Sequence, residues 1–171
     1  MGSVDAITYV QDPNLVNGVL INGNTGTNPA FSISWKAKYD ALWASRGGAT
    51  TIAAAMGSLT FTPGNYYSAA ALSMAANTVV TLDGQNQADP QFVFIAGTAL
   101  TTGADCHFKM INGAKAENVL WVFGTAATLG ADSVLEGSVL AGTFVTFGLR
   151  SVVRGCVLAK GIVSFADKGF V

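Results

Sequence analysis

Residues 138–155 (SVLAGTFVTFGLRSVVRG) and residues 156–171 (CVLAKGIVSFADKGFV) follow the same order of residue types, and this repetition decides the fold. The preceding segment, residues 118–137 (NVLWVFGTAATLGADSVLEG), is a third copy with the same 18-residue interval between equivalent positions. An earlier copy, residues 94–105 (FIAGTALTTGAD), fits at an interval of 27, and its nine extra residues are expected to form a loop around residues 111–116. The second half of the chain therefore repeats one structural unit.

A repeat as short as this one excludes a helical pair or a propeller blade. It suits one coil of a β-solenoid with three short strands, because a third of the repeat is enough for a strand and its corner. Glycine tolerates the φ values that corners need, and glycines occur at the expected junctions, namely Gly124, Gly130, Gly137, Gly142, Gly148 and Gly155. Such coils would stack about 4.8 Å apart and share one core.

Alternation along the strands predicts which side chains point outward. The columns Ala127–Val145–Val163 and Leu129–Phe147–Phe165 are apolar and are expected to point inward. Between them, Thr128, Thr146 and Ser164 would point outward together with Ala126, Phe144 and Ile162. A second face would carry the charged column Lys109–Glu136–Arg154. The third would expose the apolar column Val122–Leu140–Leu158, which requires a cover.

One amphipathic helix is predicted over residues 33–45, and it is the obvious cover for the Leu140 column. Its apolar residues have helical spacing. Ser32 or Ser34 could cap its start, and Gly47-Gly48 could end it. Residues 15–21 (LVNGVLI) are expected to form a strand pair or a corner. The apolar residues of the helix are Trp35, Tyr39, Leu42 and Trp43.

Composition predicts a single domain, residues 1–171, that binds neither nucleic acid nor a membrane. Only 11% of the residues are charged and the net charge is -1. The nine Lys and Arg form no basic cluster that could neutralise phosphates. No apolar run approaches the roughly 18 residues of a membrane span. No signal peptide is present, and Met1-Gly2-Ser3 resembles an expression remnant.

The sequence contains no arrangement typical of catalysis, so we expect no catalytic residues, no metal site and no cofactor. His107 is the single histidine, and Cys106 and Cys156 lack metal-ligand spacing and lie in different columns. We therefore expect two free, buried or half-buried thiols. Asp83, Asp89, Asp105 and Asp132 occupy predicted turns, where Asp is common. No column holds the carboxylate pair of a solenoid glycosidase.

Several stretches in fixed order resemble the microbial ice-binding-protein family. They are residues 59–66 (LTFTPGNY), 80–84 (VTLDG), 92–101 (FVFIAGTALT), 111–121 (INGAKAENVLW), 127–130 (ATLG), 135–137 (LEG), 139–141 (VLA) and 155–159 (GCVLA). The resemblance implies a mainly β fold, a right-handed discontinuous β-solenoid of triangular cross-section with one α-helix alongside and coils over about residues 55–171. It also implies a secreted, monomeric protein whose partner is the ice crystal surface. Only about thirty residues precede the helix, so the first coils are either abbreviated or missing.

In the family, the ice-binding site resembles a flat solenoid face, in some members with a Thr-(Ala/Gly)-x-(Thr/Asn) motif. Residues 98–101 (TALT) and 125–128 (TAAT) match this motif, whereas residues 143–146 (TFVT) and 161–164 (GIVS) depart from it. The resemblance thus implies a site made of Thr98, Ala99, Thr101, Thr125, Ala126, Thr128, Thr143, Phe144, Thr146, Ile162 and Ser164.

Two alternatives remain open from the residues themselves. Threonine is a good strand residue, so its columns could be purely structural. In that case the chain would be a structural or adhesive solenoid module without ice activity, and Phe144 and Ile162 would belong to a protein interface. A carbohydrate-active enzyme is disfavoured, because carboxylate pairs are missing.

Overall fold

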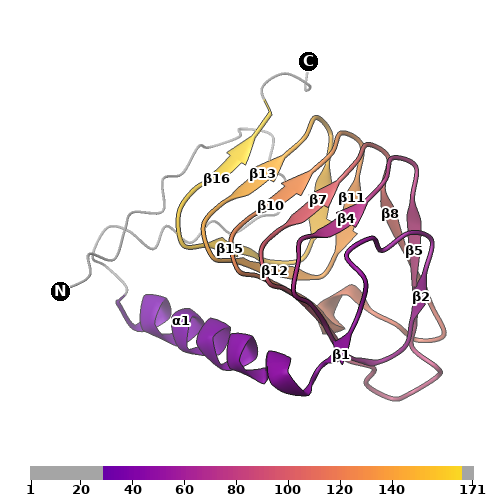
Figure 1. Ribbon diagram of the computed structural model, residues 1–171, viewed down its shortest axis with the longest axis horizontal. Coiled ribbons are helices and arrows are strands. Elements are labelled where there is room, and N and C mark those ends of the chain that lie inside the picture. Colours follow the sequence, from indigo (N-terminus) through magenta and orange to yellow (C-terminus); the bar gives the residue numbers. More distant parts are fainter. Residues whose placement is uncertain (1–28, 167–171) are drawn as a thin grey trace.

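Three parallel sheets form the sides of the molecule in a computed structural model, which describes residues 29–166 (Figure 1). The helix sheet contains β1 (Thr50–Thr51), β3 (Gly64–Ser68), β6 (Phe92–Ala96), β9 (Val119–Phe123), β12 (Ser138–Ala141) and β15 (Val157–Ala159). The threonine sheet contains β4 (Leu72–Met74), β7 (Leu100–Thr102), β10 (Ala127–Leu129), β13 (Val145–Phe147) and β16 (Val163–Phe165). The charged sheet contains β2 (Thr60–Phe61), β5 (Val79–Asp83), β8 (His107–Ile111), β11 (Val134–Glu136) and β14 (Val152–Arg154).

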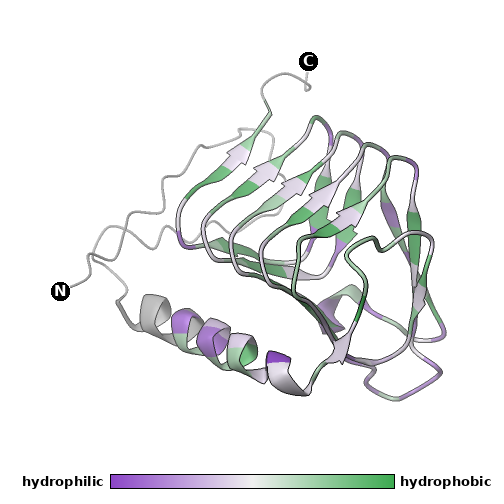
Figure 2. Cartoon of the chain, viewed as in Figure 1, coloured by the Kyte–Doolittle hydropathy of each residue, from purple (hydrophilic) through white to green (hydrophobic). Residues whose placement is uncertain are grey.

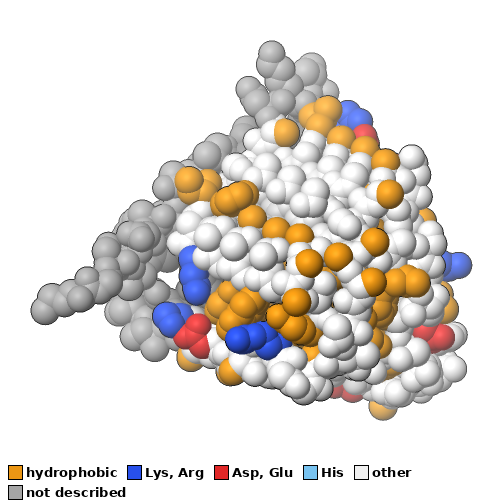
Figure 3. Space-filling model, viewed as in Figure 1, with side chains coloured by type: hydrophobic (Ala, Val, Ile, Leu, Met, Phe, Trp, Pro, Cys, Tyr) orange, Lys and Arg blue, Asp and Glu red, His pale blue; other side chains and the backbone are white. Residues whose placement is uncertain are grey.

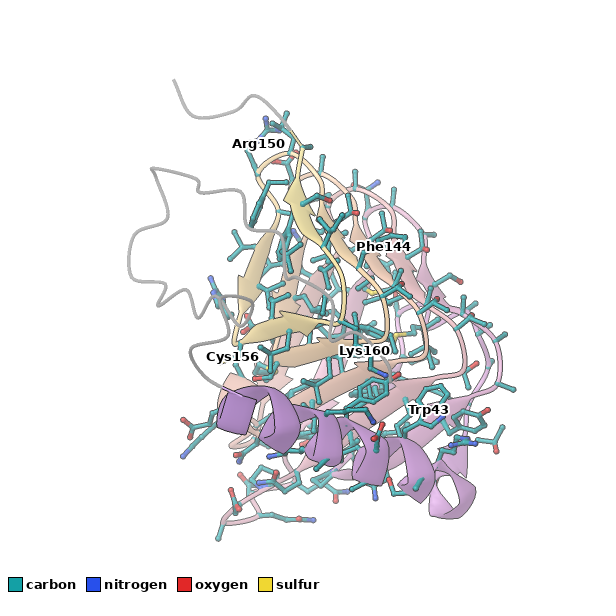
Figure 4. All side chains as sticks on the ribbon, turned by 90° about the vertical axis from the view of Figure 1, so that its left-hand side faces the viewer. Trp43, Phe144, Arg150, Cys156 and Lys160 are labelled. Carbon is teal, nitrogen blue, oxygen red and sulfur yellow. The ribbon has the colours of Figure 1, made fainter. Side chains whose placement is uncertain are left out.

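The chain visits the three sheets in the same order in every coil, which makes a β-solenoid of triangular cross-section (Figure 4). Coil I contains β1 and β2, with a single bridge between Ala55 and Ser73 in place of a strand on the threonine side. Coils II, III, IV and V each contribute one strand to every sheet, and coil VI contributes β15 and β16. Within residues 29–166 the strands of each sheet follow chain order.

The register confirms the repeat intervals. Thr128 pairs with Thr146, and Thr146 pairs with Ser164, both at the shorter interval of 18. Thr128 also pairs with Thr101, at the longer interval of 27. The longer interval arises where the chain forms a turn and the 3-10 helix η2 (Ala116–Asn118) between β8 and β9. The predicted loop around residues 111–116 is therefore confirmed.

A ladder of aromatic rings fills the interior between the sheets. The Phe94 and Trp121 rings stack with their centroids 4.4 Å apart, and the Tyr66 and Phe108 rings pack against them. Trp121 is fully buried, and its indole N–H donates to the Glu136 carbonyl at 2.8 Å. Figure 2 shows the hydrophobic residues alternating with pale ones along the strands, as expected when alternate side chains enter the core.

Asp and Asn form the corner between the threonine sheet and the charged sheet. Asn77, Asp105, Asp132 and Arg150 occupy equivalent places there, each with φ between 56° and 60°. Asn and Asp tolerate this left-handed conformation better than other non-glycine residues, so turn chemistry explains Asp105 and Asp132 as predicted. Arg150 donates two hydrogen bonds of 2.6 Å to Asp132, and this contact lowers the pKa of the Asp132 carboxyl.

The helix sheet is covered by α1 (Pro29–Ala44), which continues into the 3-10 helix η1 (Ser45–Gly48). Tyr39 packs against the outward apolar column of Ile95, Val122 and Leu140, and its hydroxyl donates to the Phe123 carbonyl at 3.0 Å. The predicted cover of the Leu140 column is thus confirmed.

The helix begins earlier than the predicted start at residue 33, at Pro29, whose fixed φ suits a first turn. Ser32 and Ser34 therefore lie inside the helix, and the predicted capping role was wrong. The strand pair or corner predicted for residues 15–21 lies outside the described residues.

On the charged sheet, the predicted column brings Glu136 and Arg154 together with a hydrogen bond of 2.7 Å between their side chains. His107 pairs in register with Val134, and Val134 pairs with Val152. On every side of the solenoid, equivalent residues of the sequence repeat therefore lie in register.

Glycine is required where coils approach closely beneath the helix. A Cβ on Gly142 would overlap the Gly124 carbonyl and would lie 3.1 Å from the Tyr39 hydroxyl. A Cβ on Gly124 would meet the Gly97 carbonyl in the same way. This column of backbone-on-backbone contacts lets the helix sheet turn tightly into the threonine sheet.

We expect Gly142→Ala to lower the free energy of unfolding by about 1–3 kcal/mol, the usual cost of overpacking. Thermal unfolding followed by circular dichroism measures the effect. Gly47→Ala is the matched control, because nothing lies within 4 Å of a Cβ at that position. Equal melting temperatures for the two variants would contradict the close approach of these coils.

Candidate binding face

A column of hydroxyl side chains runs down the outer side of the threonine sheet. The register aligns Ser73 with Thr101, Thr101 with Thr128, Thr128 with Thr146 and Thr146 with Ser164. The two strand neighbours of Thr128 are buried in the core, and so are those of Thr146, so the hydroxyl residues between them point outward. In the last two coils the Thr146 and Ser164 hydroxyls lie 3.2 Å apart.

Ser73 was not among the residues predicted for this face. Its partner Thr101 lies further along the chain than either repeat interval would place it. The signal was present in the alternation of Leu72, Ser73 and Met74, in which the two apolar residues are buried and Ser73 is exposed. The hydroxyl column therefore spans coils II to VI.

A second outward column precedes the strands. Backbone hydrogen bonds run from Leu100 N to the Ala126 carbonyl, from Ala127 N to the Phe144 carbonyl and from Val145 N to the Ile162 carbonyl. In coil III the same position is Ala99, whose carbonyl accepts from Leu72 N at 2.8 Å. The column is thus Ala99, Ala126, Phe144 and Ile162 from coil III to coil VI.

A third column lies at the edge of this side, next to the helix sheet. Thr125 N donates to the Thr98 carbonyl at 2.7 Å, and Thr143 N donates to the Thr125 carbonyl at 2.7 Å. The Thr125 hydroxyl also donates to the Thr98 carbonyl at 3.0 Å, which fixes that side chain. All three threonines are exposed. The structure therefore brings every residue of the predicted site onto one side of the solenoid.

The exposure of these residues varies more than the sequence indicated. Thr101 is exposed, whereas Thr128, Thr146 and Ser164 are half-buried. Ala126 is only 7% exposed although its position points outward. A methyl group between larger neighbours is shielded by them, so Ala126 contributes little surface. Phe144 and Ile162 are 47% and 49% exposed.

No charged side chain among the described residues lies in these three columns. Figure 3 shows the outer side of the threonine sheet as a broad area without acidic or basic side chains, crossed by a line of hydrophobic ones. Lys160 lies at the edge of this side, but its ammonium sits 4.2 Å from the centre of the Tyr39 ring, next to α1 (Figure 4). This cation–π contact holds the Lys160 ammonium next to the helix and away from the three columns.

The titratable groups considered in the sequence lie elsewhere. His107 Nε2 lies 2.8 Å from an Asp105 carboxylate oxygen, and both side chains are exposed. Cys106 and Cys156 are both free, the first buried and the second exposed. The expectation of two buried or half-buried thiols was therefore wrong for Cys156, which lies in the last, less covered coil. Within residues 29–166, His, Cys, Asp and Glu side chains form no group of three that could hold a metal ion.

Among the described residues, no helix has the length and apolarity needed to cross a membrane. The features described so far define a parallel β-solenoid with one helix-covered side, one charged side and one uncharged side that bears hydroxyl columns. That combination defines a class of repeat protein in which stacked coils present planes of equivalent side chains along the sides of the molecule.

Comparison with known sequences identifies the family. A family model described as "Ice-binding-like" matches residues 3–170, so the chain belongs to this family. It is 37% identical over 87 residues to "Ice-binding protein 1" of Shewanella frigidimarina, covering 50% of this chain and 10% of that protein. It is 35% identical over 86 residues to "Ice-binding protein" of Nostoc sp., covering 50% of this chain and 31% of that protein. The chain thus spans less than a third of the length of either relative.

Solved structures with the same fold support the assignment. The ice-binding protein of the Antarctic ascomycete Antarctomyces psychrotrophicus superposes with a TM-score of 0.65 at 32% identity, covering 76% of this chain and 67% of that one. The ice-binding protein of an Antarctic Flavobacteriaceae bacterium gives a TM-score of 0.73 at 26% identity, covering 82% of this chain and 33% of that one. Membership of this family points to a non-enzymatic function.

Proposed function

We propose that this protein binds ice through the outer side of its threonine sheet and thereby inhibits ice growth and recrystallisation. The observation that carries the proposal is the in-register hydroxyl column from Ser73 to Ser164, on a side whose three described columns carry no charged side chain. The candidate residues of this side are Ser73 and the predicted set, Thr98, Ala99, Thr101, Thr125, Ala126, Thr128, Thr143, Phe144, Thr146, Ile162 and Ser164.

Ice offers neither a charge nor a pocket, so a receptor must match a repeating water lattice over a wide area. Stacked parallel strands supply one spacing of about 4.8 Å between coils and a second of about 6.6 Å between alternate residues along a strand. Threonine adds a hydroxyl and a methyl group on a side chain that is stiff about χ1. Side chains that are already ordered lose little entropy on adsorption.

The absence of charge from this side favours ice over other partners. Charged groups keep their own hydration shells, and removing water from them costs free energy unless they are paired. Hydroxyl and methyl groups can instead share water that is already part of the lattice. We further propose that the protein acts as a monomer outside the cell, where it would meet growing ice.

Replacing Thr101 or Thr128 with tyrosine should weaken ice binding strongly, because a bulky ring would then stand within the hydroxyl column of coils II to IV and separate those coils from the lattice. A loss of about 1.4 kcal/mol in adsorption free energy corresponds to a tenfold loss in affinity. Nanolitre osmometry, which records the freezing gap and the shape of a single ice crystal, measures the effect.

Thr81→Tyr is the matched control, because Thr81 points outward from the charged sheet and pairs there with Lys109. It should leave the freezing gap unchanged. Spherical, freely growing crystals with the unmodified protein would contradict ice binding. That result would favour the alternative of an adhesive module, for which the exposed Phe144 and Ile162 are the supporting observation.

Ice activity should be independent of pH between about pH 5 and 9, because no side chain in the three columns titrates in that range. Asp132 lies outside the columns, and its pKa is lowered by Arg150, so it stays ionised throughout. The freezing gap measured at several pH values tests this. A freezing gap that changes within this pH range would contradict contact through the three uncharged columns.

A further inference from the structure

The outward column beside the hydroxyls changes character halfway along the threonine sheet. It holds alanine in coils III and IV, at Ala99 and Ala126, and then phenylalanine and isoleucine in coils V and VI, at Phe144 and Ile162. In coil II, the register of Leu72 with Leu100 places Ala71 next to Ala99. The small residues therefore belong to coils II to IV and the large residues to coils V and VI.

This change makes a step in the surface. Side chains in strands stand roughly perpendicular to the sheet, so a phenylalanine or isoleucine projects further than an alanine or a threonine. The two large side chains are about half exposed, whereas Ala126, next to Phe144 in the column, is almost completely shielded. Figure 4 shows Phe144 on the side of the solenoid away from α1, where nothing among the described residues covers it.

A flat lattice cannot rest on both levels of such a surface. Ice is rigid, and the parallel stack of strands is rigid as well, so neither can bend to follow the step. The hydroxyl column continues through coils V and VI at Thr146 and Ser164, each of which follows one of the taller residues by two positions along the chain. Contact on the flat level excludes contact over the raised one.

We infer that ice contact is concentrated on coils II to IV, and that Phe144 and Ile162 limit the ice affinity of this protein by holding the lattice away from Thr146 and Ser164. This inference rests on the proposed function. The three columns on the flat level offer Ser73, Thr101, Thr128, Ala71, Ala99, Thr98 and Thr125 to the ice. The step thus sets how many coils act together, which in a multivalent array determines the overall affinity.

The first test compares the same substitution on the two levels. Thr146→Tyr should leave the freezing gap nearly unchanged, because Phe144 already sets the height there, whereas Thr101→Tyr should reduce it strongly. If Thr146→Tyr reduces the freezing gap as much as Thr101→Tyr does, coil V contacts ice and the inference is overturned. The proposed function would survive that result, since both residues belong to the same face.

The second test removes the step. The double variant Phe144→Ala/Ile162→Ala would continue the alanine column into coils V and VI, and we expect the freezing gap at equal concentration to rise roughly twofold or more. Val152→Ala is the matched control, because Val152 is an exposed apolar residue of similar accessibility on the charged sheet. A lower or unchanged freezing gap in the folded double variant would overturn the inference.

A combined variant links the two tests. Thr146→Tyr should become damaging when it is added to Phe144→Ala/Ile162→Ala, because coil V would then contact the lattice. Circular dichroism confirms that each variant is folded, and the Thr146→Tyr comparison still decides the question if the double variant does not fold. Absence of any ice shaping by every variant and by the unmodified protein would reject the proposed function, and the inference with it.

Discussion

The parallel backbone pairing of successive coils is the constraint on which the rest of the structure depends. Coils II to V are hydrogen-bonded along all three sheets, and the register aligns each strand residue with its equivalent in the next coil. A residue type that recurs at the repeat interval therefore forms a column of equivalent side chains on the surface. A shift by one residue would exchange the buried and exposed sets on every side, so the apolar interior around Trp121 fixes the position of the outer threonines as well.

The three sides share one backbone and differ only in what their outward residues require. The apolar column of Ile95, Val122 and Leu140 needs a cover and receives α1, anchored by the Tyr39 hydroxyl. The charged side contains side-chain pairs such as Glu136 with Arg154, in which the Arg154 side chain is exposed to solvent. Among the described residues, the outward columns of the threonine side carry no charge and lie away from the helix, and the Lys160 ammonium packs on the Tyr39 ring. This division explains how a chain with few charged residues can leave a wide uncharged plane in water.

Much of this arrangement could be predicted, because the repeat in the sequence indicates directly which residues lie side by side in neighbouring coils. The two repeat intervals aligned Thr101, Thr128, Thr146 and Ser164 correctly, and the apolar Leu140 column required a helical cover. Local features were harder to predict. The sequence offers several possible helix starts, because serines that could act as N-caps follow the true start at Pro29. Ser73 lies in a coil of irregular length. The shielding of Ala126 depends on the size of its neighbours, and the exposure of Cys156 depends on how the last coil is covered. Assigning residues to columns predicts neither of these properties.

The most direct test of the account is to observe the protein on ice. Cys156 is exposed and immediately precedes a strand of the helix sheet, whereas Cys106 is buried, so a maleimide fluorophore can be attached away from the threonine side. A single-crystal ice hemisphere grown in a solution of the labelled protein then reports which planes adsorb it. The account predicts fluorescence confined to a defined set of ice planes, as expected from a rigid array with fixed spacings. A hemisphere without fluorescence, at concentrations where the protein is folded, would contradict it.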